Sequence, residues 1–388
     1  MPRSAHIAFM AVPAHGHVNP GLGLVAELAA RGHRVTYAVT EDFAPQVAEA
    51  GAEPVRYTST LPSAATQQEW PEDQAAAVLL FVDEMISVHP QLAAAYAADR
   101  PDLVIYDIGA LQAPVLAHEW GVPAICLSPT HVRFEGIEDV FGFDDSPELL
   151  AVHAKADAFF AEHGAPLTFA TMDRECSVVT IPRSFQYYAE SVAAYHTFVG
   201  PMLTARRTQG RWQRSGARPV LLISMGSAFT DQPQLYRDCL AAFGGLDWQV
   251  VLSIGEVVDP AVLGEVPPNV EVHRWVPQLD VLSQADAFIT HAGMGGTMEA
   301  LHAGVPMIAI PQAAEQFANA ARIAELGLGV HLPKEEATPQ ALRAALHRVS
   351  TDPEVLARSA AMRREIGEAG GARRAAEIVE ARLGAESA

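Results

Sequence analysis

One stretch of the chain, residues 275–316, carries the residue types that a nucleotide-diphosphate site needs. Its centre is the apolar run Ala287–Thr290, which predicts a short buried strand, followed by a glycine-rich turn and a helical pattern through Ala303. Glycines in such a turn let the backbone approach a ligand, while unpaired N–H groups and the positive end of the helix dipole attract phosphate. The residues predicted to form this phosphate-binding turn are His291, Gly293, Gly295, Gly296 and Thr297.

Residues on both sides of this turn could hold the other parts of a nucleotide sugar. Trp275 follows the apolar run Val270–Val272, so its indole is expected at a strand end, where it can stack on a flat base. Glu299 lies about two turns into the helix and can accept hydrogen bonds from ribose hydroxyls. Glu315 and Gln316 follow the next apolar run and are expected to bind the sugar. Each residue alone could be core or solvated surface, but their joint order predicts a site.

Two further side chains could move a proton. His17 follows the first apolar run of the chain, and Asp107 directly follows V-I-Y in another. If the two strands are neighbours, an Asp–His pair forms in which the carboxylate fixes the imidazole tautomer and stabilises the cation made on proton transfer. Two structural readings stay open: Asp107 could cap a helix and His17 could pair with backbone. His15, two residues earlier, is the histidine most easily confused with the base.

Strands and helices that must position these residues alternate along both halves of the chain. A helix is expected to begin with Asn19 as its N-cap and Pro20 at its first position, and to end before Gly32. Repeated strand–helix–strand units predict a parallel, doubly wound α/β sheet, which binds ligands at the carboxyl ends of its strands. The elements expected beside that helix are strands at His6–Val12, Arg34–Val39, Leu103–Tyr106, Pro123–Leu127 and Val220–Ser224 and helices at Ala110–Trp120 and Ala372–Leu383.

Several motifs together resemble the donor-binding signature of UDP-sugar-dependent glycosyltransferases, in the style of the bacterial branch that modifies macrolides and flavonoids. They are W-V-P-Q at 275–278, H-A-G-M-G-G-T-M-E at 291–299, A-G-V-P at 303–306 and P-Q-A-A-E-Q at 311–316. P-A-H-G-H-V-N-P at 13–20 and L-G-L-G-V-H-L-P-K-E-E at 326–336 resemble the same branch, so the likeness covers most of the chain.

The resemblance implies a GT-B fold, in which two doubly wound Rossmann-like domains face each other across a cleft. It implies an N-terminal acceptor-binding domain at 1–205, a linker at 206–218, a nucleotide-sugar-binding domain at 219–365 and a C-terminal helix within 366–388 that packs back on the first domain. The linker assignment also rests on composition, because this segment is rich in arginine and glycine and lacks apolar periodicity.

An inverting transfer follows from the same resemblance. His17, oriented by Asp107, would remove a proton from an acceptor hydroxyl as its oxygen attacks the anomeric carbon of a UDP-sugar, so that an α-linked donor gives a β-glycoside. The likeness favours UDP through Trp275 and Gln278, and glucose is the favoured sugar, although Glu315 stands where many relatives carry aspartate. Residues added to the donor site by the resemblance are Ser227, Val276 and Gln278. The chain has no D-x-D triplet, so no metal and no other cofactor are expected.

The acceptor is expected to be a large apolar molecule with a hydroxyl group, because the variable stretches 57–89 and 128–199 are rich in aromatic residues. Ordinary core packing is the favoured explanation for any one of these residues taken alone, so no single residue is predicted to contact the acceptor. Residues in question are Trp70, Phe81, Met85, Phe134, Phe141, Phe143, Phe159, Phe185, Tyr187 and Tyr188.

Composition limits the other possibilities. The 388 residues suit two domains, and a net charge of −20 argues against nucleic acid and anionic membranes. No apolar stretch is expected to reach the length of a membrane span. The three cysteines, Cys126, Cys176 and Cys239, are widely spaced, which favours the cytoplasm over a disulfide framework or a cysteine zinc site. A monomer and a homodimer both remain open.

Rival functions make different demands on the sequence. A dinucleotide-dependent oxidoreductase would need G-x-G-x-x-G after its first strand, where this chain has P-A-H-G-H. A non-catalytic relative that only binds a partner would have no reason to carry the proposed base together with the donor residues. A UDP-sugar epimerase of the same fold remains possible. It would differ from a transferase by consuming the UDP-sugar when no acceptor is present.

Overall fold

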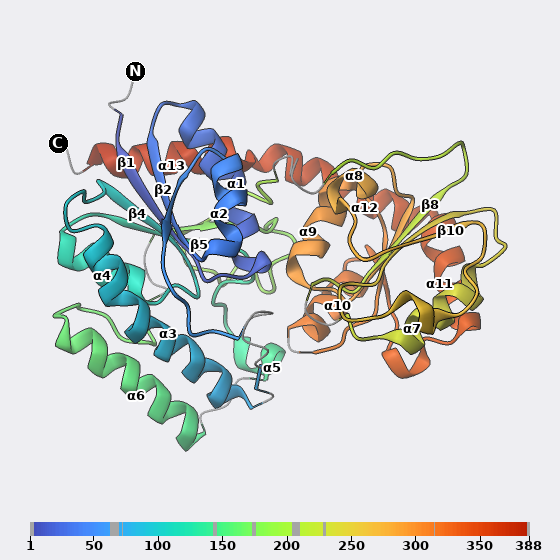
Figure 1. Cartoon of the computed structure of the whole chain (residues 1–388), viewed down its shortest axis with the longest axis horizontal. Coiled ribbons are helices and arrows are strands. Elements are labelled where there is room, and N and C mark those ends of the chain that lie inside the picture. The colour runs from blue at the N-terminus through green and yellow to red at the C-terminus, as the bar shows by residue number, and fades with distance from the viewer. Residues whose placement is uncertain are drawn as a thin grey trace. The chain divides into compact units, whose positions relative to one another are not determined.

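The computed structural model describes residues 4–62, 70–71, 73–142, 146–172, 176–203, 210–227, 230–313 and 315–385. The chain divides into two compact units (Figure 1). Unit 1 comprises Met1–Thr204 with Ala369–Ala388, and unit 2 comprises Ala205–Glu368. Each unit is built on one sheet, and every strand pair in both sheets is parallel. The α/β class predicted from the alternating pattern is therefore confirmed.

Unit 1 has a seven-stranded sheet of order β3-β2-β1-β4-β5-β6-β7. Its strands are β1 His6–Met10, β2 Arg34–Val39, β3 Glu53–Arg56, β4 Leu103–Asp107, β5 Ala124–Ser128, β6 Ser177–Val179 and β7 His196–Phe198. Its helices are α1 His15–Ala30, α2 Ala44–Glu49, α3 Gln74–Ala95, α4 Gln112–Trp120, α5 Ile137–Phe141, α6 Pro147–Glu162 and α13 Gly371–Ala385, with a 3-10 turn at Glu41–Phe43.

Unit 2 has a six-stranded sheet of order β10-β9-β8-β11-β12-β13. Its strands are β8 Val220–Ser224, β9 Gln249–Ser253, β10 Val270–His273, β11 Ala287–Thr290, β12 Met307–Ala309 and β13 Gly329–His331. Its helices are α7 Pro233–Phe243, α8 Gln278–Leu282, α9 Met294–Ala303, α10 Gln316–Glu325, α11 Pro339–Thr351 and α12 Pro353–Ala369, with 3-10 turns at Pro260–Leu263 and Lys334–Glu336.

Strand β1 shows why the strands of these sheets appear in the sequence as continuous apolar runs. Successive side chains of a strand point to opposite faces, and helices cover both faces of this sheet. Ile7 and Phe9 belong to a core cluster that includes residues of α1 and α13. Ala8 and Met10 belong to a second cluster, which includes residues of α3 and α4. Every residue of β1 is therefore buried.

Helix α1 begins earlier than its sequence pattern predicts. Ala14, with φ −137° and ψ 146°, is the N-cap, and the N–H groups of His17 and Val18 both donate to its carbonyl. Pro20 consequently lies inside the helix, where it lacks the N–H that would bond back by one turn. Burial of Val18 and the contacts of His17 favour this longer helix, so the prediction of an N-cap at Asn19 was wrong. His17 therefore sits in the first helical turn rather than in a loop.

Helix α13 packs on α1 within unit 1 (Figure 1). Ala375, Ala376 and Val379 are fully buried in the cluster that contains β1. At its edge, Glu380 accepts a hydrogen bond from Arg31 at 2.9 Å. The chain thus returns from unit 2 to complete one face of the unit 1 core.

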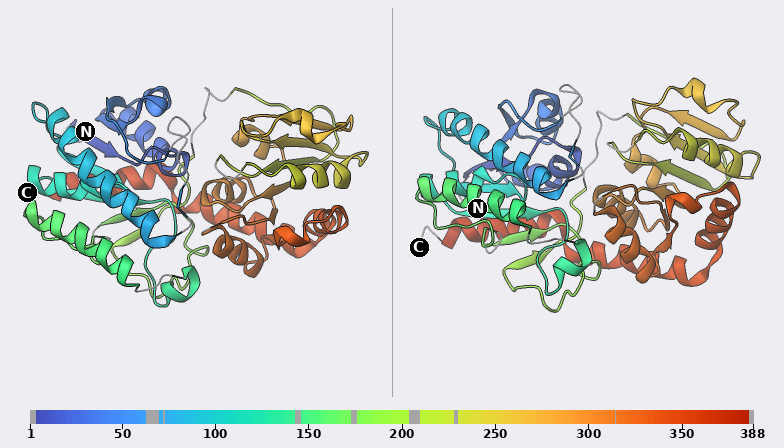
Figure 2. Two further views of the ribbon diagram at one scale, coloured as in Figure 1. Left: turned by 60° about the horizontal axis from the view of Figure 1, so that its bottom comes forward. Right: turned by 90° about the horizontal axis from the view of Figure 1, so that it is seen from below.

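Helix α3 has the length and mean hydropathy of a membrane span, the one such helix in the described part of the chain. The expectation that no apolar stretch reaches this length was therefore wrong. The helix packs against α4 and α6, beside which it lies in Figure 2, with Val82 and Met85 fully buried between them. Its buried Glu84 accepts hydrogen bonds from the backbone N–H and the hydroxyl of Thr60. These contacts identify α3 as a core helix of unit 1.

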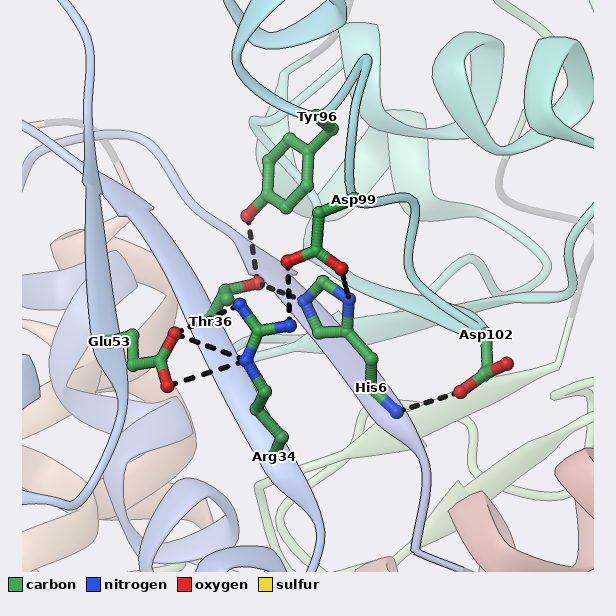
Figure 3. A network of polar contacts seen from close by, with 7 residues as sticks. All are labelled: His6, Arg34, Thr36, Glu53, Tyr96, Asp99 and Asp102. Atoms are coloured by element: carbon green, nitrogen blue, oxygen red, sulfur yellow. Dashed lines mark hydrogen bonds and ion pairs between the residues drawn. The ribbon is translucent and has the colours of Figure 1, made fainter.

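A polar network fastens the amino-terminal edge of the unit 1 sheet (Figure 3). Arg34 of β2 pairs with Glu53 of β3 at 3.0 Å and with Asp99 at 2.6 Å. Thr36 joins the same strand to the segment after α3 through a 3.0 Å contact with Tyr96. Because these pairs fix the strands at the amino ends, the register carries through to the carboxyl ends, where the site residues lie. The network is completed by His6 and Asp102.

Candidate active site

His17 and Asp107 meet at the carboxyl edge of the unit 1 sheet. Strands β1 and β4 are neighbours, and the order of strands reverses between them, which is where open α/β sheets bind ligands. Nδ1 of His17 lies 2.7 Å from Oδ1 of Asp107. The carboxylate is fully buried, whereas the imidazole is 27% exposed. Because an ionised carboxylate only accepts, the proton sits on Nδ1 and the lone pair on Nε2. This arrangement suits a general base.

Backbone N–H groups of the following turn hold Asp107 in place, one at its carboxylate and one at its main-chain carbonyl. Oδ1 of Asp107 also accepts a 2.9 Å hydrogen bond from the N–H of Gly109, and the Asp107 carbonyl accepts from Ala110. A Cβ on Gly109 would lie 3.1 Å from that Oδ1 and 3.2 Å from Val12, which is closer than neighbours normally allow. Asp107 therefore shapes the turn before α4 and orients His17 at the same time. Sequence reasoning missed Gly109, although a glycine two residues after a strand-end aspartate is a signal for such a turn.

The surroundings of Asp107 are apolar and poorly solvated. Within the residues that the structure describes, its Oδ2 is buried without a hydrogen-bond partner, as is the hydroxyl of Tyr37. Burial, with a smaller contribution from the charge of Asp107, raises the pKa of Tyr37, which therefore stays neutral. A carboxylate in such a place gains strongly from a cation nearby, and proton transfer to His17 would supply one.

His15 takes a different role from His17. Its ring packs edge-on against Phe43, with centroids 5.0 Å apart. Since His15 is the first residue of α1, this contact fixes the start of the helix on α2 and its preceding turn. The geometry therefore separates a packing histidine from the one that contacts Asp107.

In unit 2 the candidate residues follow β8 and β11, again at the point where strand order reverses. Gly226 and Ser227 come after β8, and His291 and Gly293 come after β11. Ser227 is exposed, and the two residues that follow it lie outside the described part of the chain. The predicted phosphate-binding turn therefore lies at the same kind of sheet position as the His17–Asp107 pair.

The imidazole of His291 is packed between two glycines. A Cβ on Gly226 would lie 2.5 Å from its Cε1, and a Cβ on Gly293 would lie 2.4 Å from its Nε2. Gly226 also has a φ of +79°, which other residues rarely adopt. Burial lowers the pKa of His291 to about 4, so the ring is neutral at pH 7. The neutral imidazole can donate an N–H hydrogen bond to a phosphate oxygen, but it does not add the positive charge of an imidazolium.

The neutral state of His291 predicts a pH dependence of stability. Below about pH 6.5 the unfolded imidazole binds a proton, whereas the folded one stays neutral until about pH 4. The free energy of unfolding should therefore fall as the pH drops through this window, by up to about 3 kcal/mol from this group. Denaturant unfolding at pH 7.5 and 4.5 of wild type and of His291→Asn measures it. The variant should lose less stability than wild type on acidification; parallel losses would contradict the assignment.

The N-terminus of α9 supplies the hydrogen-bond donors of the turn. Gly293 is the N-cap, and the first intrahelical bond runs from the N–H of Thr297 to its carbonyl at 3.0 Å. The N–H groups of Met294, Gly295 and Gly296 precede that bond and so have no acceptor within the helix. Thr297 was predicted to belong to the phosphate-binding turn, but the helix already uses its N–H. The Thr297 side chain is fully buried.

Two residues that sequence reasoning missed hold this turn in shape. Ala292 has a left-handed φ of +63°, which costs free energy for a residue with a Cβ. The side chain of Asn319, in α10, donates to the Ala292 carbonyl at 2.9 Å, and the Thr290 hydroxyl accepts from the Ala292 N–H at 3.1 Å. Both partners are fully buried. They hold a strained backbone between His291 and Gly293, within the predicted phosphate-binding turn.

Glu299 and Gln278 are already paired with each other. The Gln278 amide, at the start of α8, donates to Oε2 of Glu299 at 2.7 Å, and the Glu299 side chain is buried in α9. The contact orients the carboxylate that is predicted to bind ribose. Trp275 is 44% exposed just beyond β10, as a stacking surface must be, whereas Val276 is buried and can reach a nucleotide only through its backbone.

Gln316 uses its side-chain oxygen within the protein. Its side chain is 2% exposed, and its Oε1 accepts from the N–H groups of Gln312 at 2.9 Å and Ala313 at 3.2 Å. The oxygen is therefore committed to shaping the loop between β12 and α10. Glu315, the N-cap of α10, is exposed and so remains the carboxylate of this loop that a sugar could reach.

The aromatic residues of unit 1 fall into two groups. Met85 and Phe159 pack in the core between α3 and α6, which is the core-packing alternative that the sequence left open for each of these residues. Around His131, a residue that sequence reasoning missed, a second group gathers at ring distances of 5.1–5.7 Å: Phe141, Phe185 and Tyr187. Phe134 and the exposed Tyr188 extend this group. Trp70 and Phe81 contact each other. Phe143 lies outside the described residues.

Comparisons with known proteins agree with this arrangement. The family model "Erythromycin biosynthesis protein CIII-like, C-terminal domain" matches residues 237–381. The oleandomycin glycosyltransferase of Streptomyces antibioticus is 46% identical over 392 residues, covering 98% of this chain and 91% of that protein. The NDP-glycosyltransferase YjiC of Bacillus licheniformis is 41% identical, covering 97% and 98%. The crystal structure of the glycotransferase of kitacinnamycin superimposes with a TM-score of 0.88 at 44% identity, covering 99% and 100%.

These relatives match along nearly the whole chain, and both sheets agree with the GT-B folds of the solved structures. The chain is therefore a member of the bacterial family 1 glycosyltransferases, with the GT-B fold.

Proposed function

We propose that this glycosyltransferase moves a hexose, with glucose favoured, from a UDP-sugar to a hydroxyl of a large apolar natural product with inversion at the anomeric carbon. The observation that carries the proposal is the 2.7 Å contact between His17 and the buried Asp107 at the carboxyl edge of the unit 1 sheet. His17 Nε2 takes the acceptor proton as the hydroxyl oxygen forms its bond to the anomeric carbon and the bond to UDP breaks. A hydroxyl is a far weaker acid than imidazolium, so proton removal must accompany attack.

Unit 2 supplies the donor site in this proposal. Trp275 stacks on uracil, and Glu299, oriented by Gln278, binds the ribose hydroxyls. The N–H groups of Met294, Gly295 and Gly296 at the start of α9 meet the charge that develops on the leaving phosphate, with His291 as a neutral donor beside them. Ser227 and Glu315 are exposed at the same edge of the sheet and serve the phosphate and the sugar.

A macrolide is the favoured acceptor class, and a flavonoid or related polyphenol is the second. The oleandomycin glycosyltransferase, 46% identical, is named for a macrolide acceptor. The aromatic group around His131 and Phe134 offers apolar surface of the kind that binds a large ring system. We place the enzyme in the cytoplasm, because its three widely spaced cysteines do not suggest an exported disulfide framework.

Product analysis tests this function. The enzyme is incubated with UDP-glucose and oleandomycin or a flavonol, and the product is examined by mass spectrometry and proton NMR. The proposal predicts one added hexose joined through oxygen, with the anomeric coupling of a β-glycoside. An α-glycoside would contradict inversion, and consumption of UDP-glucose to another UDP-sugar would indicate an epimerase. TDP-glucose as a competing donor should react at least tenfold more slowly if Trp275 and Gln278 select UDP.

Glycosyl transfer should not require a metal. The proposed phosphate site consists of N–H groups, a neutral imidazole and a hydroxyl, and no acidic side chain among these residues could hold a cation there. Initial rates of glycosyl transfer should be measured in about 5 mM EDTA and in Mg²⁺. The two rates should agree within about twofold. A loss of activity in EDTA that Mg²⁺ restores would show that a metal bridges the pyrophosphate.

A further inference from the structure

Three side chains of unit 1 that have no part in the proposed transfer form a separate cluster. They are His89 of α3, Glu119 of α4 and His163, the C-cap of α6. His89 Nε2 lies 3.2 Å from Oε2 of Glu119, and His163 Nδ1 lies 2.7 Å from Oε1. Each oxygen of one carboxylate thus faces an imidazole nitrogen. One ligand atom from each of the three residues lies within 4.8 Å of the other two.

We propose that His89, Glu119 and His163 bind a divalent transition metal ion, with Zn²⁺ as the best fit. Two imidazoles and one carboxylate are a familiar ligand set for Zn²⁺, which completes a tetrahedron with a water molecule. Mg²⁺ and Ca²⁺ prefer oxygen ligands alone, so the two nitrogens disfavour them. The three protein ligands lie on three helices and come from distant parts of the sequence, so a motif search would not find them.

The spacing of the ligand atoms suits this ion. Tetrahedral Zn²⁺ with bonds of about 2.0–2.1 Å places neighbouring ligand atoms about 3.4 Å apart. The 3.2 Å separation of His89 Nε2 and Glu119 Oε2 already matches. His163 Nδ1 contacts the other oxygen, Oε1, at 2.7 Å, so its ring must shift as the metal replaces this hydrogen bond. His163 lies beyond the last turn of its helix and is 24% exposed, so it can make this adjustment.

Aromatic packing holds the two imidazoles toward each other. Phe159 contacts the ring of His89 edge-on at 5.4 Å and the ring of His163 at 4.4 Å. The centroids of the two imidazoles lie 4.2 Å apart. Glu119 is 29% exposed, which gives an ion access from solvent.

The position of the cluster indicates what the metal would do. Helix α4 runs back antiparallel to β4, so Glu119, near its C-terminal end, lies toward the amino edge of the sheet, away from the edge where His17 and Asp107 meet. Helices α3, α4 and α6 share the core cluster of Val82, Val115 and Phe160. An ion held by all three would tie these helices together in the folded state, which stabilises unit 1 without a part in glycosyl transfer.

Metal binding by the whole, untagged chain tests the proposal. After treatment with EDTA and removal of the chelator, wild type should take up one Zn²⁺ with a Kd in the micromolar range or tighter in equilibrium dialysis. Co²⁺ should give the intense visible absorption of a tetrahedral ion. Glu119→Gln and His163→Gln should each weaken binding at least tenfold. A hundredfold excess of free Zn²⁺ over Kd should raise the thermal midpoint of wild type by about 5 °C.

His153→Gln is the matched control, because His153 lies on the same helix α6 but stacks on Phe169 at 4.2 Å. This variant should bind Zn²⁺ as wild type does. Thermal midpoints of unfolding measured in EDTA separate the loss of the ion from a folding defect. Glu119→Gln and His163→Gln support the site if their midpoints match that of wild type in EDTA but do not rise when Zn²⁺ is added. Equal uptake by wild type and Glu119→Gln, or no stoichiometric uptake by wild type, would overturn it. Transfer activity should be unchanged in Glu119→Gln, whichever donor proves correct.

Discussion

His17→Ala should lower the turnover number by about 10²- to 10⁴-fold while leaving the affinity for UDP within about twofold of wild type. The loss is expected because alanine cannot take the proton of the acceptor hydroxyl, whereas the proposed donor residues all belong to unit 2. Steady-state rates with saturating UDP-glucose and acceptor, together with calorimetric titration of UDP, measure both quantities. Partial recovery of the rate with added imidazole would identify the missing group as a base.

His15→Ala is the control for this variant. It removes a histidine from the same helical turn, but one that packs on Phe43 rather than contacting Asp107. We expect a modest loss of stability and a rate within about fivefold of wild type, since the removed contact is one of packing. If His17→Ala kept more than about a tenth of wild-type turnover, or if His15→Ala lost as much, His17 would not be the base.

Asp107→Asn should lower turnover by about 10²-fold or more while the chain remains folded. An asparagine fits the same space and can still accept the hydrogen bond that Asp107 receives from Gly109. It lacks the negative charge that stabilises the imidazolium. If the amide instead turned its N–H groups to His17, the wrong tautomer would be favoured and the Gly109 bond would be lost, because both contacts are made by Oδ1. Rates of Asp107→Asn measured beside thermal unfolding separate catalysis from stability.

Two further variants sharpen the test of Asp107. Tyr37→Phe removes a buried hydroxyl near the carboxylate that has no hydrogen-bond partner among the described residues, so it should change the rate little. The double variant of His17→Ala with Asp107→Asn should be about as slow as His17→Ala alone, because residues that act as a unit are not additive. Additive losses in the double variant would show that Asp107 acts independently of His17.

The fold class and many element bounds could be predicted from the sequence. The runs Arg34–Val39, Val220–Ser224 and Ala287–Thr290 are strands with the predicted ends, because strands buried on both faces are continuous apolar runs between polar boundaries. The start of α1 could not be predicted in this way. Proline usually marks the first turn of a helix, but here packing of Val18 and the contact of His17 extend the helix before Pro20.

The candidate site was predictable where it depends on strand ends and not where it depends on tertiary contacts. His17 and Asp107 follow strands that become neighbours, so their contact follows from topology. Asn319 holds Ala292 from another helix, and no local pattern indicates that partner. Gln316 looked like a sugar ligand in the sequence, yet its oxygen holds the adjacent loop. Whether a polar side chain faces a ligand or the backbone is decided by packing that the local sequence does not encode.

Release of UDP from UDP-glucose, measured with and without a macrolide or flavonol acceptor for wild type and His17→Ala, tests the central claim most directly. The account predicts release by wild type that depends on the acceptor and falls by about 10²-fold or more in the variant. Equal release with and without acceptor would indicate hydrolysis rather than transfer. Acceptor-dependent release that His17→Ala leaves intact would contradict the proposed mechanism.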